Sequence, residues 1–407
     1  MRRTRRDDGR GSALAGCAAL ALWLGAAGAA AQAPEERGGL EIAEWNAGRV
    51  TAAGLSLPTR VIHPARGGPY PVVGVIHGAG RDGGRHVELA RTLASRGLVA
   101  VLPDMPCSVV GCDHDANAAA LSALLEWAEA QGATAGSPLA GLVDGSRRGL
   151  IGHSWGGLSS HLAASRDASI MALVLLDPND NSARQGRGAA AAVRAASAQL
   201  LAAVPGSCNG LWDEDAITPA VATPALELTV TRSGHCDPEE PGDSLCPLGC
   251  GRGDAATSAT FRRYAVAWVA CVLSGDAAMA SWLGGPSMTA DEAGRIEGVV
   301  RRGLDALPCR GAAPGEDAGA MDDDAGTMDD DAGAGREDAG ATREDGGAPP
   351  GLDASAGGGD AAIARDAGAG GEAGGGCGCR VGERRRALPL LALALLALAR
   401  RRQTLRG

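Results

Sequence analysis

Lysine is absent from this chain of 407 residues, and aromatic side chains make up only 2% of it. Alanine, glycine and arginine take their places, and glycine alone accounts for 63 residues. We interpret this bias as the habit of a GC-rich genome rather than as a sign of function. Because 45% of the residues are still hydrophobic, the chain can form one domain of roughly 250 residues with additional segments.

The chain also lacks a clustered basic face and a long apolar run near its C-terminus. Between Gly38 and Arg310 the sequence is only mildly acidic, which excludes the basic surface that nucleic-acid binding requires. The apolar run Ala387–Ala399 has 13 residues, so as a helix it would span about 20 Å. A bilayer has a hydrocarbon core of roughly 30 Å, which argues against a permanent single-pass anchor.

The N-terminus has the three parts of a secretory signal peptide. Four arginines among the first six residues precede the apolar stretch Ala13–Ala27, and the small residues Gly28–Ala33 follow. Because Pro34 disfavours cleavage directly before it, we expect residues 1–31 to be removed. The sequence therefore predicts an exported protein.

The 11 cysteines also favour export. Eight of them lie between Cys107 and Cys309, a density typical of oxidising compartments. A metal site is the competing interpretation, because Cys246 and Cys250 have tolerable ligand spacing, but no second pair stands nearby. We therefore expect disulfides and no metal. Connectivity cannot be deduced from sequence; the pairs that we expect are Cys107–Cys112, Cys208–Cys236 and Cys246–Cys250.

Short apolar runs alternate with helix-like segments between Leu40 and about Leu304. Continuous apolar runs are typical of strands that are buried on both faces of a parallel sheet. The pattern predicts an α/β domain over residues 38–309, with a mostly parallel central sheet and helices on both faces. The expected strands contain Val61-Ile62, Pro71–Ile76, Leu98–Leu102, Gly149–Gly152, Ile170–Leu176, Gln199–Val204 and Leu226–Val230, and the expected helices are His86–Ser95, Ala116–Ala130, Gly156–Ala164, Ala189–Ala196 and Thr260–Leu273.

Residues 310–376 have a different composition. From residue 311 to residue 376 there are 16 acidic residues against 3 arginines, and large apolar residues are almost absent. Such a segment cannot bury enough surface to offset the entropy of ordering it. The composition therefore predicts a disordered, extended linker rather than a calcium site, whose regular ligand spacing is missing.

Residues 377–407 combine three features in a fixed order. Cys377-Gly378-Cys379 comes first, then the apolar run, then Arg400–Arg402. This order resembles the myxobacterial C-terminal sorting tail (MYXO-CTERM). The resemblance implies processing near Cys377 or Cys379 and delivery to the cell surface, with contact to the membrane or envelope through the tail. A plain hydrophobic tail is the alternative.

The strongest chemical signal is the stretch Gly152-His153-Ser154-Trp155-Gly156-Gly157. It follows an apolar strand directly and precedes a helix, which is the setting that a nucleophile elbow requires. The two flanking glycines let the strand and helix backbones approach closely. The serine hydroxyl then lies at a helix N-terminus, where the helix dipole favours developing negative charge. The pattern makes Ser154 a candidate nucleophile.

A serine hydroxyl needs a neighbouring base, which is most often a histidine. The order nucleophile, acid, histidine leaves His235 among the 7 histidines. The acid has two candidate positions. Asp177 ends the run Ala172–Leu176 and is favoured, while Asp213 or Asp215 follows the next run and stays an alternative.

The oxyanion of such a reaction needs two backbone donors. One should be the N–H of Trp155, directly after the nucleophile. The other should come from the loop His77-Gly78-Ala79-Gly80 after the first parallel strand, with Ala79 as the expected donor.

From about Leu40 to Leu283 these residues resemble the α/β-hydrolase superfamily. The resemblance is to the branch that contains chlorophyllases, platelet-activating-factor acetylhydrolases and cutinase-like polyester hydrolases. Leu176-Asp177-Pro178 is similar to the acid position of the first two groups, and Asp215–Pro219 to that of the third. The cysteine-rich insert around Cys236 departs from the pattern.

The resemblance implies hydrolysis of carboxylic esters through an acyl-enzyme, without metal or organic cofactor. The substrate would be a small-molecule, lipid or polymer ester, and we expect a monomer. Two alternatives remain: a non-catalytic binding protein on a hydrolase scaffold, and an acyltransferase that uses the same three residues.

Overall fold

The computed structural model describes residues 32–180, 183–204 and 223–311. The predicted signal peptide, the linker beyond Gly311 and the sorting tail lie outside these ranges, as do Cys208, Asp213 and Asp215. Residues 323–407, which are counted as a separate unit of the chain, are likewise outside the description.

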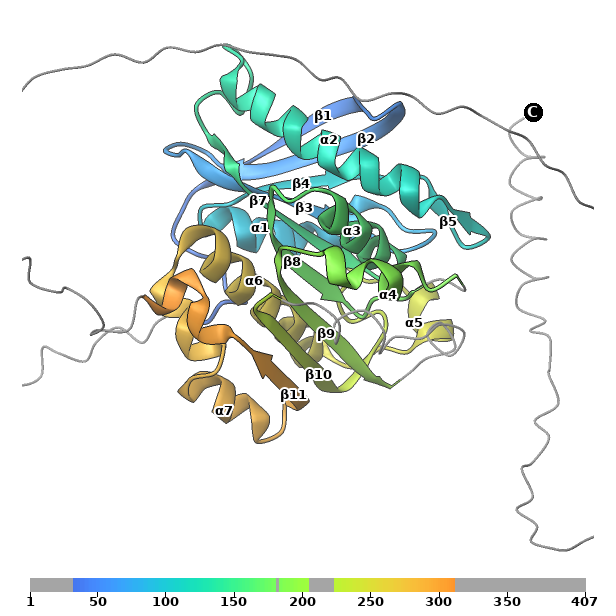
Figure 1. Ribbon diagram of the computed structural model, residues 1–407, viewed down its shortest axis with the longest axis vertical. Helices are drawn as coiled ribbons and strands as arrows, with labels where there is room; N and C mark the ends of the chain where they lie inside the picture. Colours follow the sequence, from blue (N-terminus) through green and yellow to red (C-terminus); the bar gives the residue numbers. More distant parts are fainter. Residues whose placement is uncertain (1–31, 181–182, 205–222, 312–407) are drawn as a thin grey trace, which may run out of the picture. The chain divides into compact units, whose positions relative to one another are not determined.

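A nine-stranded sheet forms the centre of the described part (Figure 1), in the order β1-β2-β4-β3-β7-β8-β9-β10-β11. Its inner strands, from β4 to β10, are parallel to one another, while β1, β2 and β11 pair antiparallel at the edges. This confirms the predicted, mostly parallel sheet. The strands are β1 (Ile42–Ala52), β2 (Leu55–Pro64), β3 (Tyr70–Ile76), β4 (Val99–Pro103), β7 (Val143–His153), β8 (Ile170–Leu176), β9 (Ala196–Val204), β10 (Ala225–Gly234) and β11 (Ile296–Arg302).

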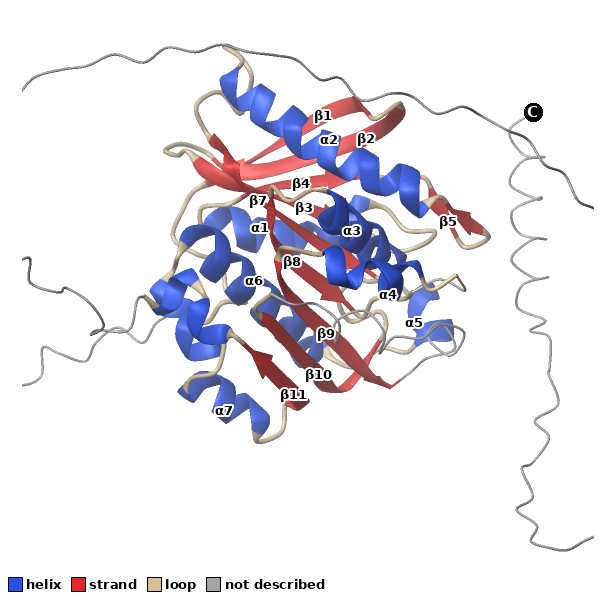
Figure 2. Ribbon diagram, in the orientation of Figure 1, coloured by secondary structure: helices blue, strands red, loops and turns tan. Residues whose placement is uncertain are grey.

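Helices cover both faces of this sheet (Figure 2). One apolar core contains α1 and α6, and a second contains α2 and α3. These helices pack on strands whose side chains are apolar on both faces. Such strands are expected in a parallel sheet, because both of its faces are buried. The helices are α1 (Val87–Ser95), α2 (His114–Ala133), α3 (Trp155–Arg166), α4 (Gln185–Ala189), α5 (Leu245–Cys250), α6 (Ala255–Ser274) and α7 (Pro286–Glu292).

The structure departs from the predicted elements in several places, and α5 and α7 were not among the predicted helices. The helix expected over Ala189–Ala196 is wrong, because α4 ends at Ala189, only a short 3-10 turn follows, and Ala196 begins β9. The edge strands β1 and β11 were not expected. A small hairpin of β5 (Cys107–Ser108) and β6 (Gly111–Cys112) was also missed.

The disulfides agree only in part with the predicted pairs. Cys107–Cys112 is confirmed and closes the small hairpin. Cys236 pairs with Cys246, so the expected partners of both were wrong; Cys250 is disulfide-bonded as well. The sulfur atoms of Cys236, Cys246 and Cys250 lie within 4.8 Å of one another, but a sulfur in a disulfide is not the thiolate that binds metal.

A further disulfide, Cys271–Cys309, was not predicted. It joins the last turn of α6 to the end of the described chain. The two cysteines are 38 residues apart in the sequence, and α7 and β11 lie between them. Both cysteines are buried: Cys271 is 0% exposed and Cys309 is 3% exposed. Within the described ranges, no helix has the length and hydrophobicity to cross a membrane.

Candidate active site

Ser154 occupies the turn between the end of β7 and the start of α3. Its backbone has φ 55° and ψ −125°, a strained conformation that costs about 1–3 kcal/mol and recurs at functional sites. The flanking glycines make this turn possible. A Cβ on Gly152 would lie 2.4 Å from the carbonyl oxygen of Gly156, and one on Gly156 would lie 2.4 Å from that of His77. Only glycine fits either position without a backbone shift.

Asp177 follows the last residue of β8, and its carboxylate contacts His235 directly. The Asp177 Oδ2 atom accepts a hydrogen bond from His235 Nδ1 at 2.6 Å. The other oxygen, Oδ1, accepts from the backbone N–H of Ala202 on β9 at 2.8 Å. The side chain is completely buried. The carboxylate is therefore held in one orientation, and it fixes the proton of His235 on Nδ1, which leaves Nε2 as the basic nitrogen.

His235 stands directly after β10 in a loop whose backbone is held from two sides. Its N–H donates to the carbonyl of Cys250 at 3.1 Å. Its own carbonyl accepts from Nε2 of His153 at 2.8 Å. His153 thus supports the loop that carries His235. No local pattern in the sequence indicates this supporting contact, because the two residues are 82 positions apart.

Ser154 itself is 7% exposed, and its hydroxyl accepts a hydrogen bond from Nδ2 of Asn179 at 3.3 Å. In the described structure Ser154 and His235 are not hydrogen-bonded to each other. Catalytic hydrogen bonds are often long in free enzymes and tighten with substrate. Asn179 was not singled out from the sequence. Its position two residues after Asp177, at the end of a parallel strand, is the signal that could have found it.

The loop His77–Arg81, here called the oxyanion loop, lies beside the nucleophile. A Cβ on Gly78 would lie 3.0 Å from the Cβ of Ser154. The N–H of Gly80 donates to Cys107 at 2.8 Å, whereas the N–H of Ala79 has no acceptor in the described part of the chain. Trp155 is the first residue of α3. The expected donor Trp155 thus follows Ser154 directly, and the expected donor Ala79 follows Gly78, whose backbone lies against Ser154.

Buried histidines surround this site and are held neutral. Burial, and then the neighbouring His235, keep the pKa of His153 well below its usual value. Complete burial, together with the charge of His77, lowers the pKa of His86 to about 3. Further along, burial lowers the pKa of His161, on α3, to about 4.

These pKa shifts predict a loss of stability in mild acid. Below about pH 6.5 the unfolded chain binds protons at His86 and His161 that the folded chain does not bind, so the free energy of unfolding falls as the pH decreases. Because an unfolded histidine is only half-protonated at pH 6.5, each residue contributes about 1.6 kcal/mol between pH 6.5 and pH 5, or about 3 kcal/mol for both. Thermal melts at these two pH values should differ by roughly 10 °C.

His161→Gln is the matched control for this experiment. Its amide can still donate to the carbonyl of Gly186, which accepts from His161 Nε2 at 3.0 Å, but it cannot titrate. The pH dependence should become shallower by about one proton. Equal melting temperatures of the wild type at both pH values would contradict the prediction.

Comparison with known proteins agrees with this geometry. Residues 87–214 match the family model described as PET hydrolase-like. The fold is that of the α/β hydrolases. The matched segment contains Ser154 and Asp177 and ends before His235, and it supports an ester-hydrolase function. It also supports the cutinase-like branch of the superfamily that the sequence suggested. No curated protein gives a significant match.

Proposed function

We propose that this protein is an exported serine hydrolase that cleaves carboxylic esters through an acyl-enzyme. The observation that carries the proposal is the 2.6 Å contact between His235 Nδ1 and Asp177. It joins the ends of β8 and β10, which lie on the same side of β7, the strand that leads into Ser154. The three residues then act as nucleophile, base and acid.

In the first half of the reaction, the Ser154 oxygen attacks the ester carbonyl while His235 Nε2 takes the hydroxyl proton. The buried Asp177 carboxylate stabilises the imidazolium that forms. Backbone N–H groups of Ala79 and Trp155 donate to the oxyanion. The imidazolium then gives its proton to the departing alcohol, which leaves the acyl group on Ser154.

In the second half, a water molecule takes the place of the alcohol. His235 removes one proton from it as the oxygen attacks the acyl carbon, and the same proton returns to the Ser154 oxygen when the acid is released. Every proton transfer uses side chains of this chain, so the route requires no metal or organic cofactor. The proposed setting is the cell surface or the medium, where the acidic linker would separate a monomeric domain from the envelope.

The test is covalent labelling of the purified protein with a fluorophosphonate, followed by peptide mass spectrometry. We expect a single modified serine, Ser154, together with turnover of esters in a panel of graded acyl chain length. A protein that takes up no label and hydrolyses no ester would be a binding protein on this scaffold. Addition of candidate alcohols to the assay would reveal acyl transfer in place of hydrolysis.

A further inference from the structure

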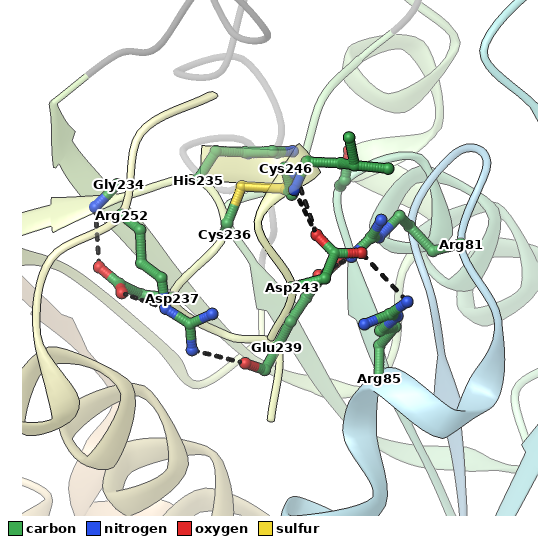
Figure 3. The surroundings of a disulfide bond; sticks show 12 residues. Arg81, Arg85, Gly234, His235, Cys236, Asp237, Glu239, Asp243, Cys246 and Arg252 are labelled. Carbon is green, nitrogen blue, oxygen red and sulfur yellow. Dashed lines mark hydrogen bonds and ion pairs between the residues drawn. A yellow bond between two sulfur atoms is a disulfide. The ribbon is translucent and has the colours of Figure 1, made fainter. Parts of the chain in front are cut away.

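A buried ion pair joins the oxyanion loop to the loop that carries the base. The second of these, Gly234–Glu240, is called the base loop here. Arg81 Nε donates to Glu239 Oε1 at 2.7 Å, and Arg81 Nη2 contacts Glu239 Oε2 at 2.5 Å (Figure 3). The guanidinium thus meets the carboxylate with two parallel bonds, the most directional form of ion pair between side chains.

The surroundings of this pair hold it in place. The side chains of Arg81 and Glu239 are 14% and 1% exposed. Arg81 also contacts Asp243 at 2.9 Å, and Asp243 contacts Arg85 at 3.1 Å. Burial disfavours the charged guanidinium, but the hydrogen bonds that Arg81 donates to Glu239 outweigh this and raise the pKa of Arg81. Figure 3 also shows the Cys236–Cys246 disulfide, which closes the base loop onto α5 beside Asp243.

The pair connects the two catalytic groups by short chain paths. Arg81 lies two residues after Ala79, whose N–H faces no acceptor, and Glu239 lies four residues after His235. The glycines at positions 78 and 80 leave the oxyanion loop little side-chain packing of its own. Other contacts between the two segments, such as that from Glu240 N to Arg85 O at 2.7 Å, lie further along the chain.

We propose that Arg81 and Glu239 are positioning residues that set the distance between the oxyanion donor Ala79 and the imidazole of His235. This loop clamp rests on the proposed function. The two groups act together only when the oxyanion forms, so their relative placement affects the transition state more than substrate binding. A displacement of about 1 Å can cost roughly a hundredfold in rate. Loss of the clamp therefore lowers kcat and leaves KM nearly unchanged.

The decisive variant replaces both partners, Arg81→Met with Glu239→Leu. Removal of both charges avoids an unpaired buried ion, so the fold should persist. We expect kcat for a soluble short-chain ester to fall roughly 10- to 100-fold, with KM within about threefold of the wild type. The rate of Ser154 phosphonylation by a fluorophosphonate should fall in parallel. The melting temperature should stay near that of the wild type.

Two further variants make the result specific. Arg85 lies in the same segment as Arg81 and also pairs with Asp243, but it does not contact Glu239. Arg85→Met therefore removes a neighbouring positive charge and leaves the clamp in place. Its kcat and labelling rate should equal those of the wild type. Arg81→Lys keeps the charge but loses the two-pronged contact, so it should recover only part of the rate. If the double variant does not fold, Arg81→Lys decides the matter with the same measurements.

Wild-type kcat and labelling rate in a folded clamp variant would show that the ion pair is only structural, while the proposed function would stand. An equal loss in Arg85→Met would mean that general charge removal, rather than the clamp, is responsible. Absence of label on wild-type Ser154 would instead remove the proposed function, and the clamp with it.

Discussion

Ser154→Ala should lower ester turnover by on the order of a millionfold, to the residual rate that binding and the oxyanion donors provide. The alanine cannot form the acyl-enzyme, and no hydroxyl remains for His235 to deprotonate. The fold should be unaffected, because the side chain loses only its hydrogen bond from Asn179. Steady-state kinetics with a chromogenic ester and a thermal melt would measure both effects.

The matched control is Ser165→Ala, on the last turn of the helix that Ser154 precedes. The Ser165 hydroxyl donates to the carbonyl of Leu162 at 2.8 Å and lies at the opposite end of α3 from the nucleophile. This variant should keep full activity. Full activity in Ser154→Ala would overturn the nucleophile assignment and the mechanism built on it.

Asp177→Asn should lower turnover by about four orders of magnitude. The backbone N–H of Ala202 points at Oδ1, so the asparagine must present its carbonyl oxygen there and its NH₂ group to His235. That NH₂ can bond only to an unprotonated Nδ1, which moves the histidine proton to Nε2. His235 would then present a protonated Nε2 to Ser154 and could not accept the proton of the serine hydroxyl.

Asp213→Asn and Asp215→Asn test the alternative acid in the same assay. Both residues lie outside the described ranges, and each substitution should cost far less activity than Asp177→Asn. Near wild-type turnover in Asp177→Asn, with a collapse in either of the other two, would assign the acid to the cutinase-like position.

The inner strands could be predicted because a strand that is buried on both faces needs a continuous run of apolar residues. Ile170–Leu176, for example, is β8 to the residue. The edge strands left no such run. In β11 only Ile296 is buried, and polar and apolar residues are mixed. Ala189–Ala196 failed for another reason: alanine is a strong helix former, but helix propensity is a weak preference that tertiary packing overrides, and here Val193 and Ala195 are buried in the core just before β9 begins.

The residues of the site likewise fall into two groups: those that a local pattern reveals and those that only the folded chain brings together. Ser154 lies in a local motif, and His235 and Asp177 follow from chain order and strand ends, so each could be named in advance. The contact between Arg81 and Glu239 spans 158 residues and has no local pattern. The pairing of Cys236 with Cys246 depends on how the base loop folds back onto α5, which spacing alone does not determine.

The Cys271–Cys309 disulfide has a mechanical consequence if the domain is tethered through its C-terminal tail. Traction on the chain beyond Gly311 would enter the fold two residues earlier, at Cys309. A covalent bond would pass that load to α6, in the buried core, and β11 and α7 would carry none of it. The edge strand β11, which pairs with β10 and in which Ile296 is the one buried residue, would therefore not peel away when shear pulls the protein from its anchor.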